Sequence, residues 1–424
     1  MLRPMVVFLT PKPPYPLTSG MAIRQFHLLR AYALWGRVHL VTFCEDEAQR
    51  DAAQHLGGYC ERVHAVSAGT IVGESHLAKL SRVPRIVRRV LAVGPTVISW
   101  SYSAEMARVV EELSADADIV HVARLHMAAQ AERLLAARHR RAGMVLDLDD
   151  VEASYRFRQL RYAPPRALVD RVYARYDAAR LWAYQASAVR QFDRVFVCSE
   201  RDRRRFVRSS VVVVPNGTCV PDSLPHHLGD GRTIMFCGLL SYGPNIDGVN
   251  FLVSSVFPEI RRSVPDARLL IVGGKPPREI RAFHDGDSIV VAGDVPSVTE
   301  YYARSSVAIV PLRFGAGTRI KILEAWAHGV PVVSTTVGCE GLEGVHGRHL
   351  MVADSAQGLA GRCVALLRSE TLRQRLGSEA WRLVSERYRW SDIGARAVAE
   401  VAQLLKSRTK DDEPTTVVDP AFGA

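Results

Sequence analysis

The sequence of 424 residues lacks any apolar run that approaches a membrane-spanning helix, which needs roughly 18 consecutive apolar residues. Its opening segment, MLRPMVVFLTPKPP, holds an apolar run too short for a secretory signal. The seven cysteines are odd in number and none forms a CxxC pair, which disfavours a zinc site and fits a reducing compartment. We therefore expect a cytoplasmic chain without membrane spans, and no bound metal.

Patterns typical of nucleic-acid recognition, such as an RNP or zinc-finger motif, are also missing. The net charge of +11 lies entirely in residues 1–209, which hold 32 Lys+Arg against 21 Asp+Glu, whereas residues 210–424 hold 23 of each. A basic face attracts phosphates on membranes or nucleic acids. Without a nucleic-acid motif, the sequence favours an anionic membrane or a lipid-linked acceptor, and a merely solvated arginine-rich surface is the alternative.

Short apolar segments alternate with helical stretches along most of the chain, and residues 160–192 read as a long exposed helix or pair of helices. This alternation predicts an α/β protein with two Rossmann-like domains built on parallel sheets, and the chain length also exceeds one ordinary core. The expected strands are residues 5–9, 38–43, 118–122, 144–148, 194–198, 211–214, 233–238, 268–272, 289–291 and 307–311.

The most informative segment is PLRFGAGTRIKILEAWAHGVPVVS at residues 311–334. It predicts a strand, a loop with Gly315, Gly317 and Thr318, a helix that ends near residue 329, and another strand. Small residues let a ligand approach the backbone, and the first N–H groups of a helix favour an anion. Arg319 and Lys321 lie at the helix start, where the helix dipole disfavours cations. The segment therefore predicts a phosphate-binding site.

The stretch GTRIKILEAWAHGVPVVS resembles the donor-site signature of glycosyltransferase family 4, and its glycine loop resembles the branch that includes sugar transferases of exopolysaccharide synthesis. The resemblance implies that Glu324 binds the ribose of a nucleotide-sugar and that the preceding loop meets its diphosphate. The family's second glutamate, eight positions earlier, is Ala316 here. The Arg and Lys that relatives place in residues 238–245 are absent, so Arg319 and Lys321 are expected to neutralise the diphosphate.

The resemblance also implies roles for three other glycine-bearing turns or strand ends. Gly20, in the first N-terminal loop, would approach the donor and acceptor, although its neighbours Ser19 and Thr18 could simply cap a helix. Gly238 lies in the turn where relatives hold diphosphate. The turn from Gly293 to Val295 resembles the loop that contacts the nucleobase.

Further candidates lie in or just after strands of the first half. His121 occupies the place of the first of two family histidines, with the second one missing, and is therefore a catalytic candidate, although a histidine on a strand that faces the core is often a structural residue. His126 is a weaker candidate. Adjacent acids at a strand end are costly to bury unless they are used, so Asp149 or Asp150 could orient the acceptor hydroxyl. The string Asp147-Leu148-Asp149 could also be taken for a metal-binding DxD motif, which the remaining architecture opposes.

The resemblance implies the GT-B architecture, in which two Rossmann-like domains face a central cleft. We expect an acceptor-side domain at 1–209, a nucleotide-sugar-binding domain at 210–380, a helix at 381–406 that crosses back to the first domain, and a disordered tail at 407–424.

The implied function is transfer of a sugar from a nucleotide diphosphate sugar to a hydroxyl acceptor, with retention and without metal or other cofactor. The setting would be surface or extracellular polysaccharide or glycolipid synthesis, with a lipid-linked glycan as acceptor at the inner face of the cytoplasmic membrane. One alternative is a non-catalytic GT-B subunit that binds nucleotide or glycan for a partner enzyme. A sugar-nucleotide epimerase is another.

Overall fold

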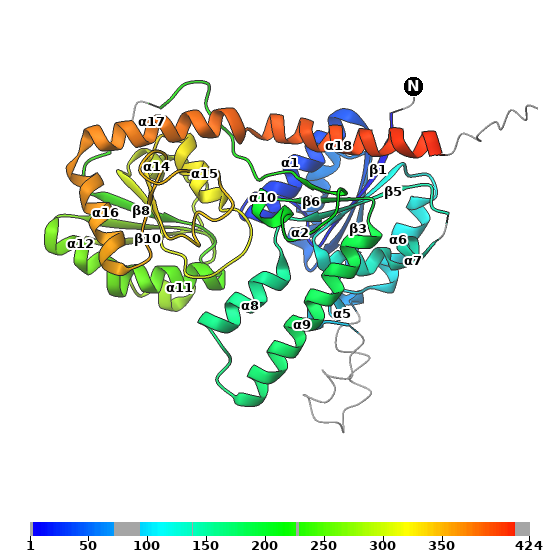
Figure 1. The fold of residues 1–424 in the computed structure, drawn as a ribbon, viewed down its shortest axis with the longest axis horizontal. Coiled ribbons are helices and arrows are strands. Elements are labelled where there is room, and N and C mark those ends of the chain that lie inside the picture. Colours follow the sequence, from blue (N-terminus) through cyan, green and yellow to red (C-terminus); the bar gives the residue numbers. More distant parts are fainter. Residues whose placement is uncertain (1–2, 72–93, 138, 226–228, 412–424) are drawn as a thin grey trace, which may run out of the picture.

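The computed structural model describes residues 3–71, 94–137, 139–225 and 229–411. Two parallel sheets lie side by side, each with helices packed against it, and the helices α17 (Glu370–Arg387) and α18 (Trp390–Asp411) run along one side of both (Figure 1). Within the described ranges, no helix combines the length and apolar content that crossing a bilayer requires.

The first sheet has the strand order β3-β2-β1-β4-β5-β6-β7, and all its pairs are parallel. The edge strand β3 was not predicted, because its half-exposed residues show no apolar run. The last strand, β7, lies beyond residue 209, where the first domain was expected to end. The strands are β1 (Met5–Thr10), β2 (Arg37–Cys44), β3 (Arg62–Ser67), β4 (Ile119–Ala123), β5 (Gly143–Leu148), β6 (Arg194–Val197) and β7 (Val211–Val213).

The second sheet has the order β10-β9-β8-β11-β12-β13 and is also parallel throughout. Its central strands are continuously buried, as expected when helices cover both faces of a parallel sheet. Both sheets confirm the predicted α/β class with two Rossmann-like halves. The strands are β8 (Thr233–Cys237), β9 (Arg268–Gly273), β10 (Ile289–Gly293), β11 (Val307–Val310), β12 (Val332–Ser334) and β13 (Met351–Val352).

Helices connect the strands in both halves. The helix expected at about 245–264 is divided, because a π-helical turn at Leu252–Val256 separates α11 from α12. The helices are α1 (Gly20–Trp35), α2 (Glu47–His55), α5 (Thr96–Ser99), α6 (Ala104–Ser114), α7 (Glu132–Ala136), α10 (Glu200–Arg203), α11 (Gly243–Phe251), α12 (Phe257–Ser263), α13 (Arg278–Arg281), α14 (Thr299–Ala303), α15 (Ile320–Ala327) and α16 (Ala356–Arg368).

Two chain crossings join the halves. The linker after β7 meets the return segment where the N–H of Thr218 donates to the carbonyl of Tyr388 at 2.8 Å. Beyond it, α18 packs on α1, and Trp390 stacks on His27 with ring centroids 4.7 Å apart. The α18 helix continues to Asp411, so the first five residues of the expected disordered tail are helical, and the remainder lies outside the described residues.

Residues 160–192 fall in a pair of helices, α8 (Glu152–Tyr162) and α9 (Leu168–Gln191). The intervening loop contains Pro164 and Pro165, which cannot donate the hydrogen bonds of a helix interior. Figure 1 shows α8 and α9 projecting from the body as a two-helix arm, on the side opposite α17 and α18.

Candidate nucleotide-sugar site

The carboxyl ends of the second sheet's strands carry the glycines predicted from the sequence. Gly238 follows β8, and its backbone passes so close to Gly273 that a Cβ at Gly273, whose φ is 150°, would overlap the carbonyl of Gly238. Gly293 ends β10. Ligands of open α/β sheets bind outside the carboxyl ends of the strands. These glycines therefore lie at the edge of the sheet where a nucleotide-sugar is expected to bind.

Helix α15 begins at this same edge. Arg319 is its N-cap residue, with φ −91° and ψ 97°, and Lys321 lies in the first turn. The helix is followed by Gly329 with φ 68°, which confirms the predicted strand, loop, helix and strand. One face of α15 is buried in the core and consists of Ile322, Leu323, Ala325 and Trp326.

Arg319 is buried, with 9% of its surface exposed. Its Nη1 donates to the carbonyls of Ala316 and Gly317, the latter at 2.7 Å, while Nε and Nη2 find no partner among the described residues. A Cβ at Gly315 would overlap this guanidinium, so glycine there makes room for it. Buried polar groups without partners are rare and costly, and this half-satisfied cation at a helix N-terminus therefore suits an anionic ligand.

Lys321 reaches back from α15 to the turn after β8. Its Nζ donates to Asn245 Oδ1 at 2.8 Å and lies 4.3 Å from the ring centroid of Phe236. A Cβ at Gly238 would be 2.5 Å from Nζ. Burial, aided by the charge of Arg319, lowers the pKa of Lys321 to about 7. The ammonium group thus occupies the turn at 238–245 from which the family's usual cations are missing.

Glu324 is mostly buried, one turn further along α15. Tyr302 donates its hydroxyl to Glu324 Oε2 at 3.4 Å. Burial raises the pKa of Glu324, although Lys321 and the Tyr302 hydroxyl act in the opposite direction. Nearby, Val295 follows Asp294, whose Oδ1 accepts from the N–H of Lys275 at 2.8 Å and links the turns after β9 and β10.

The first half contacts the same glycine loop. A Cβ on Gly317 would overlap Asp150 Oδ1, and a Cβ on Gly20 would be 3.4 Å from Ile320 Cδ1. Asn216 donates its Nδ2 to Thr318 Oγ1 at 2.9 Å. The structure therefore brings Gly20, Asp150 and the 315–318 loop together from distant parts of the sequence.

Arg24 organises the first-half side of this contact. It forms a fully buried ion pair with Asp147, with Nη2 and Oδ1 2.7 Å apart, and its Nη1 donates to Asn216 Oδ1 at 3.2 Å. Because Arg24 engages Asp147, the Asp147 and Asp149 side chains do not present two free carboxylates at one point, and the DxD interpretation is not supported.

Sequence reasoning missed Arg124, which gathers the acids at the end of β5. Its backbone has φ 75° and ψ 147°, a region that non-glycine residues rarely occupy. Its guanidinium lies 3.0 Å from Asp149, 3.4 Å from Asp150 and 3.5 Å from Glu152. Burial raises the pKa of Asp149, which Arg124 counteracts and Asp150 reinforces. The adjacent acids were the only sequence signal near this cluster, and the backbone path that brings Arg124 to them leaves no local pattern.

His121 lies in the core of the first half and not at the candidate site. Its side chain is completely buried in β4, stacks on Phe8 at 4.5 Å and contacts the Tyr32 hydroxyl through Nδ1 at 3.1 Å. Burial lowers the pKa of His121 to about 4. This environment is that of a structural histidine, so we leave His121 out of the candidate site. His126 faces Glu152 at 3.4 Å.

Helix α8 and the turn after β12 close the other side of the contact. Arg158 donates to the Gly315 carbonyl at 3.0 Å and to Glu340 Oε1 at 2.8 Å, and Arg201 also pairs with Glu340. Further along α8, Tyr162 stacks on Phe314, with ring centroids 6.2 Å apart. The loop for the diphosphate is thus held by groups from both halves, and none of these cross-contacts was visible in the sequence.

Gly317→Ala is expected to separate the two halves or displace Asp150, because the new methyl group overlaps the carboxylate. The matched control is Gly347→Ala: Gly347 has φ 78° and open space around its Cβ position, whereas Gly317 has φ 70°. Both substitutions carry the left-handed backbone cost of about 1–2 kcal/mol. Thermal unfolding should therefore show a clearly larger loss for Gly317→Ala, and equal losses would contradict the close contact.

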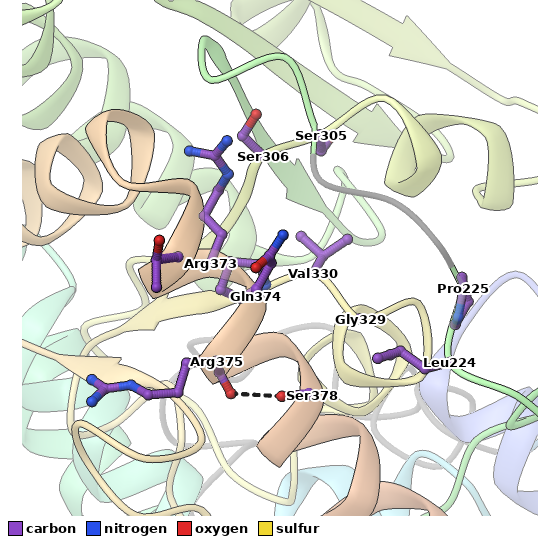
Figure 2. Close-up of a pocket in the computed structure, with 12 residues that line it drawn as sticks. Leu224, Pro225, Ser305, Ser306, Gly329, Val330, Arg373, Gln374, Arg375 and Ser378 are labelled. Atoms are coloured by element: carbon purple, nitrogen blue, oxygen red, sulfur yellow. Dashed lines mark hydrogen bonds between the residues drawn. The ribbon is translucent and has the colours of Figure 1, made fainter.

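A separate cavity of about 550 Å³ lies elsewhere on the second half. Figure 2 shows Arg373 reaching toward Ser306, while Arg375 points away. Ser306 and Gly329 precede β11 and β12, so this cavity is at the amino ends of the strands, opposite the α15 start. Arg373 donates to the carbonyls of Leu366 and Leu367 and so caps α16. We therefore do not assign the donor to this cavity.

Comparison with known proteins agrees with the fold and motif. Residues 231–369 match the model of the family described as Glycosyl transferases group 1, which confirms the predicted resemblance for the half that carries the motif. The full fold is that of GT-B glycosyltransferases. Sucrose-phosphate synthase from Thermosynechococcus elongatus superposes with a TM-score of 0.71 at 17% identity, covering 96% of this chain and 100% of that one. HepE of Anabaena, in complex with UDP and glucose, gives 0.64 at 12% identity, with 95% and 100% covered.

Among curated relatives, phosphatidyl-myo-inositol mannosyltransferase of Mycobacterium leprae is 30% identical over 216 residues, which make up 48% of this chain and 56% of the relative. The matched region thus spans about half the length of this relative. The shared fold and the family match of residues 231–369 support a sugar-transfer site, and its substrates are a matter for proposal.

Proposed function

We propose that this chain is a glycosyltransferase that moves a sugar from a nucleotide diphosphate sugar to a hydroxyl acceptor. The observation that carries the proposal is the pair of cations at the start of α15, the buried Arg319 and the partly buried Lys321. Arg319 keeps two nitrogen atoms without partners in the described structure, and Lys321 has its pKa lowered to about 7. Both features are unfavourable without an anion, and a diphosphate at a helix N-terminus would relieve both.

In the proposed reaction, the bond between the sugar carbon and the diphosphate oxygen breaks, and a bond to the acceptor oxygen forms. Arg319 and Lys321 would stabilise the charge that develops on the leaving diphosphate. Such stabilisation contributes roughly several kcal/mol in a site that excludes water. Asp150 lies against the loop at Gly317 and would orient the acceptor hydroxyl. The resemblance supports retention, with the acceptor proton passing to a leaving phosphate oxygen, and a reaction that needs no metal.

Glu324 would bind the ribose in this arrangement, and the turn at Gly293 to Val295 would meet the base. The pKa of Glu324 is raised by burial. Hydrogen bonds donated by ribose hydroxyls would stabilise the ionised form of its carboxylate, so the raised pKa is consistent with this role. HepE is described in complex with UDP and glucose, and by analogy we propose a nucleoside diphosphate sugar as donor here.

The proposed acceptor is a hydroxyl on a lipid-linked glycan at the inner face of the cytoplasmic membrane, in surface polysaccharide or glycolipid synthesis. The basic excess of residues 1–209 supports this, and the mannosyltransferase relative is named for a phospholipid substrate. Calorimetric titration with a panel of nucleotide-sugars, followed by assays of donor hydrolysis and transfer, tests the proposal. Binding without turnover would favour the non-catalytic subunit instead, and an absence of binding would refute the donor site.

The affinity for a nucleotide diphosphate sugar is expected to fall about tenfold between pH 6 and pH 8. Lys321, with its pKa lowered to about 7, is mostly protonated at the lower pH and mostly neutral at the higher one, and only the charged form attracts diphosphate. The sugar-linked diphosphate keeps its charge over this range. Calorimetry at both pH values should show the decline in the native chain and its loss in Lys321→Met. A flat profile for the native chain would contradict the role of Lys321.

A further inference from the structure

The two-helix arm exposes an unusual concentration of apolar surface. Seven of the fifteen large apolar side chains that are exposed in the described ranges lie between residues 157 and 182. On α9, Leu168, Val169 and Val172 are 73%, 60% and 60% exposed, and Tyr176 is 44% exposed. Their spacing places them on one side of the helix, opposite the buried face that includes Leu181. Tyr176 contacts Tyr173 and Arg180 of the same helix, while Leu168, Val169 and Val172 stay largely exposed in the described structure.

Cations accompany the apolar side chains. Between residues 156 and 175 the exposed charged side chains are five arginines and one aspartate, Asp170. Arginine beside aliphatic and aromatic groups is the composition of elements that bind in the interface of anionic membranes. Each arginine near such a surface is attracted by the negative lipids, and large exposed apolar patches mark interaction sites.

The arm also connects directly to the candidate site. Arg158 of α8 donates to the carbonyl of Gly315 at 3.0 Å, and Tyr155 stacks on Tyr242 of the second half at 6.3 Å. At the inner side of the arm, an open pocket of about 720 Å³ lies between α8, α9 and α5, lined by Trp100, Leu160, Val169 and Tyr173 among others. A surface that receives the arm is therefore brought close to the candidate site.

We infer that the α8–α9 arm docks on an anionic lipid bilayer, with Leu168 and Val172 entering the interface and the surrounding arginines contacting lipid headgroups. The positive charge of the arm selects this occupant over a neutral surface. The inference rests on the proposed function, because it names the element that presents the cleft to a membrane-borne acceptor. It assigns membrane binding to one arm of the fold instead of to the basic surface of residues 1–209 in general.

Vesicle co-sedimentation of the full chain tests this inference, with phosphatidylcholine vesicles that contain or lack phosphatidylglycerol. We expect binding to the anionic vesicles, and a loss of at least about tenfold in affinity for Leu168→Asp combined with Val172→Asp. The matched control combines Leu34→Asp with Val345→Asp, which are 78% and 54% exposed outside the arm, and should bind as the native chain does. Circular dichroism and thermal unfolding identify any variant that fails to fold.

A second set of variants separates the arm from general charge. Arg161, Arg166 and Arg175 are changed together to Gln on the arm, and compared with the same change at three exposed arginines elsewhere in the first half, Arg50, Arg108 and Arg133. We expect the arm variant to lose anionic-vesicle binding and the control to retain most of it. Equal losses in the two sets would overturn the inference.

Two other outcomes are also decisive. In one outcome, the native chain does not bind vesicles but forms a dimer, and the changes at Leu168 and Val172 dissociate that dimer. A second copy of the chain would then cover the arm, and the inference would fail. Nucleotide-sugar binding is measured on the same proteins, because it reports the donor site independently. Arm-dependent vesicle binding without nucleotide binding would support the docking surface and refute the transferase proposal. Nucleotide binding without arm-dependent vesicle binding would support the transferase proposal and refute the docking surface.

Discussion

Glu324→Ala is expected to weaken the binding of a nucleotide diphosphate sugar by roughly a hundredfold while leaving the fold intact. Hydrogen bonds to a charged group contribute about 1.5–3 kcal/mol each, and a ribose offers two hydroxyl donors. Alanine is the best helix former, and the carboxylate's contact to Tyr302 is a long one at 3.4 Å, so stability should change little. Calorimetry with the intact donor and thermal unfolding measure the two effects.

Glu324→Gln provides the matched variant, since it keeps the size of the side chain and removes its charge. We expect an intermediate loss, because an amide accepts hydrogen bonds more weakly than a carboxylate. Unchanged donor affinity in Glu324→Ala would remove the ribose assignment. A large drop in unfolding temperature would show that Glu324 serves the core instead.

Arg319→Ala and Lys321→Ala are each expected to lower the affinity for a nucleoside diphosphate by roughly tenfold to a hundredfold, and to leave the uncharged nucleoside almost unaffected. Removing a cation that contacts an ionised group costs about 1.5–3 kcal/mol, and a nucleoside has no charge to lose. For Arg319 the loss should come with higher stability, because its buried Nε and Nη2 atoms lack partners in the described structure.

Arg362→Ala, an exposed cation on α16, is the control for a general change in charge and should bind both ligands normally. The two ligands are compared by calorimetry on the same preparations. Parallel losses for nucleoside and nucleoside diphosphate would refute a phosphate role. That pattern would indicate that the cations support the shape of the turn at 238–245.

Much of the second half followed from the sequence. The apolar segments, the glycines and the helix of residues 311–334 were placed correctly, because buried parallel strands and strand-to-helix turns leave local patterns. The short strand β13 and the edge strand β3 were missed, since two paired residues or a half-exposed edge leave no such pattern. His121 matched a family position, but its neighbours on adjacent strands enclose it.

The sequence by itself determined the α/β class, the two halves and the candidate loop at 315–321, because each depends on residues close together in the chain. Only the tertiary structure decided that Lys321 reaches Asn245 and that Asp150 lies on Gly317. Those contacts join residues 76 or more positions apart, and they depend on how parallel strands bring their carboxyl ends together and how two sheets face each other. The strained backbone that aims Arg124 at three carboxylates is likewise a product of packing, which no local pattern encodes.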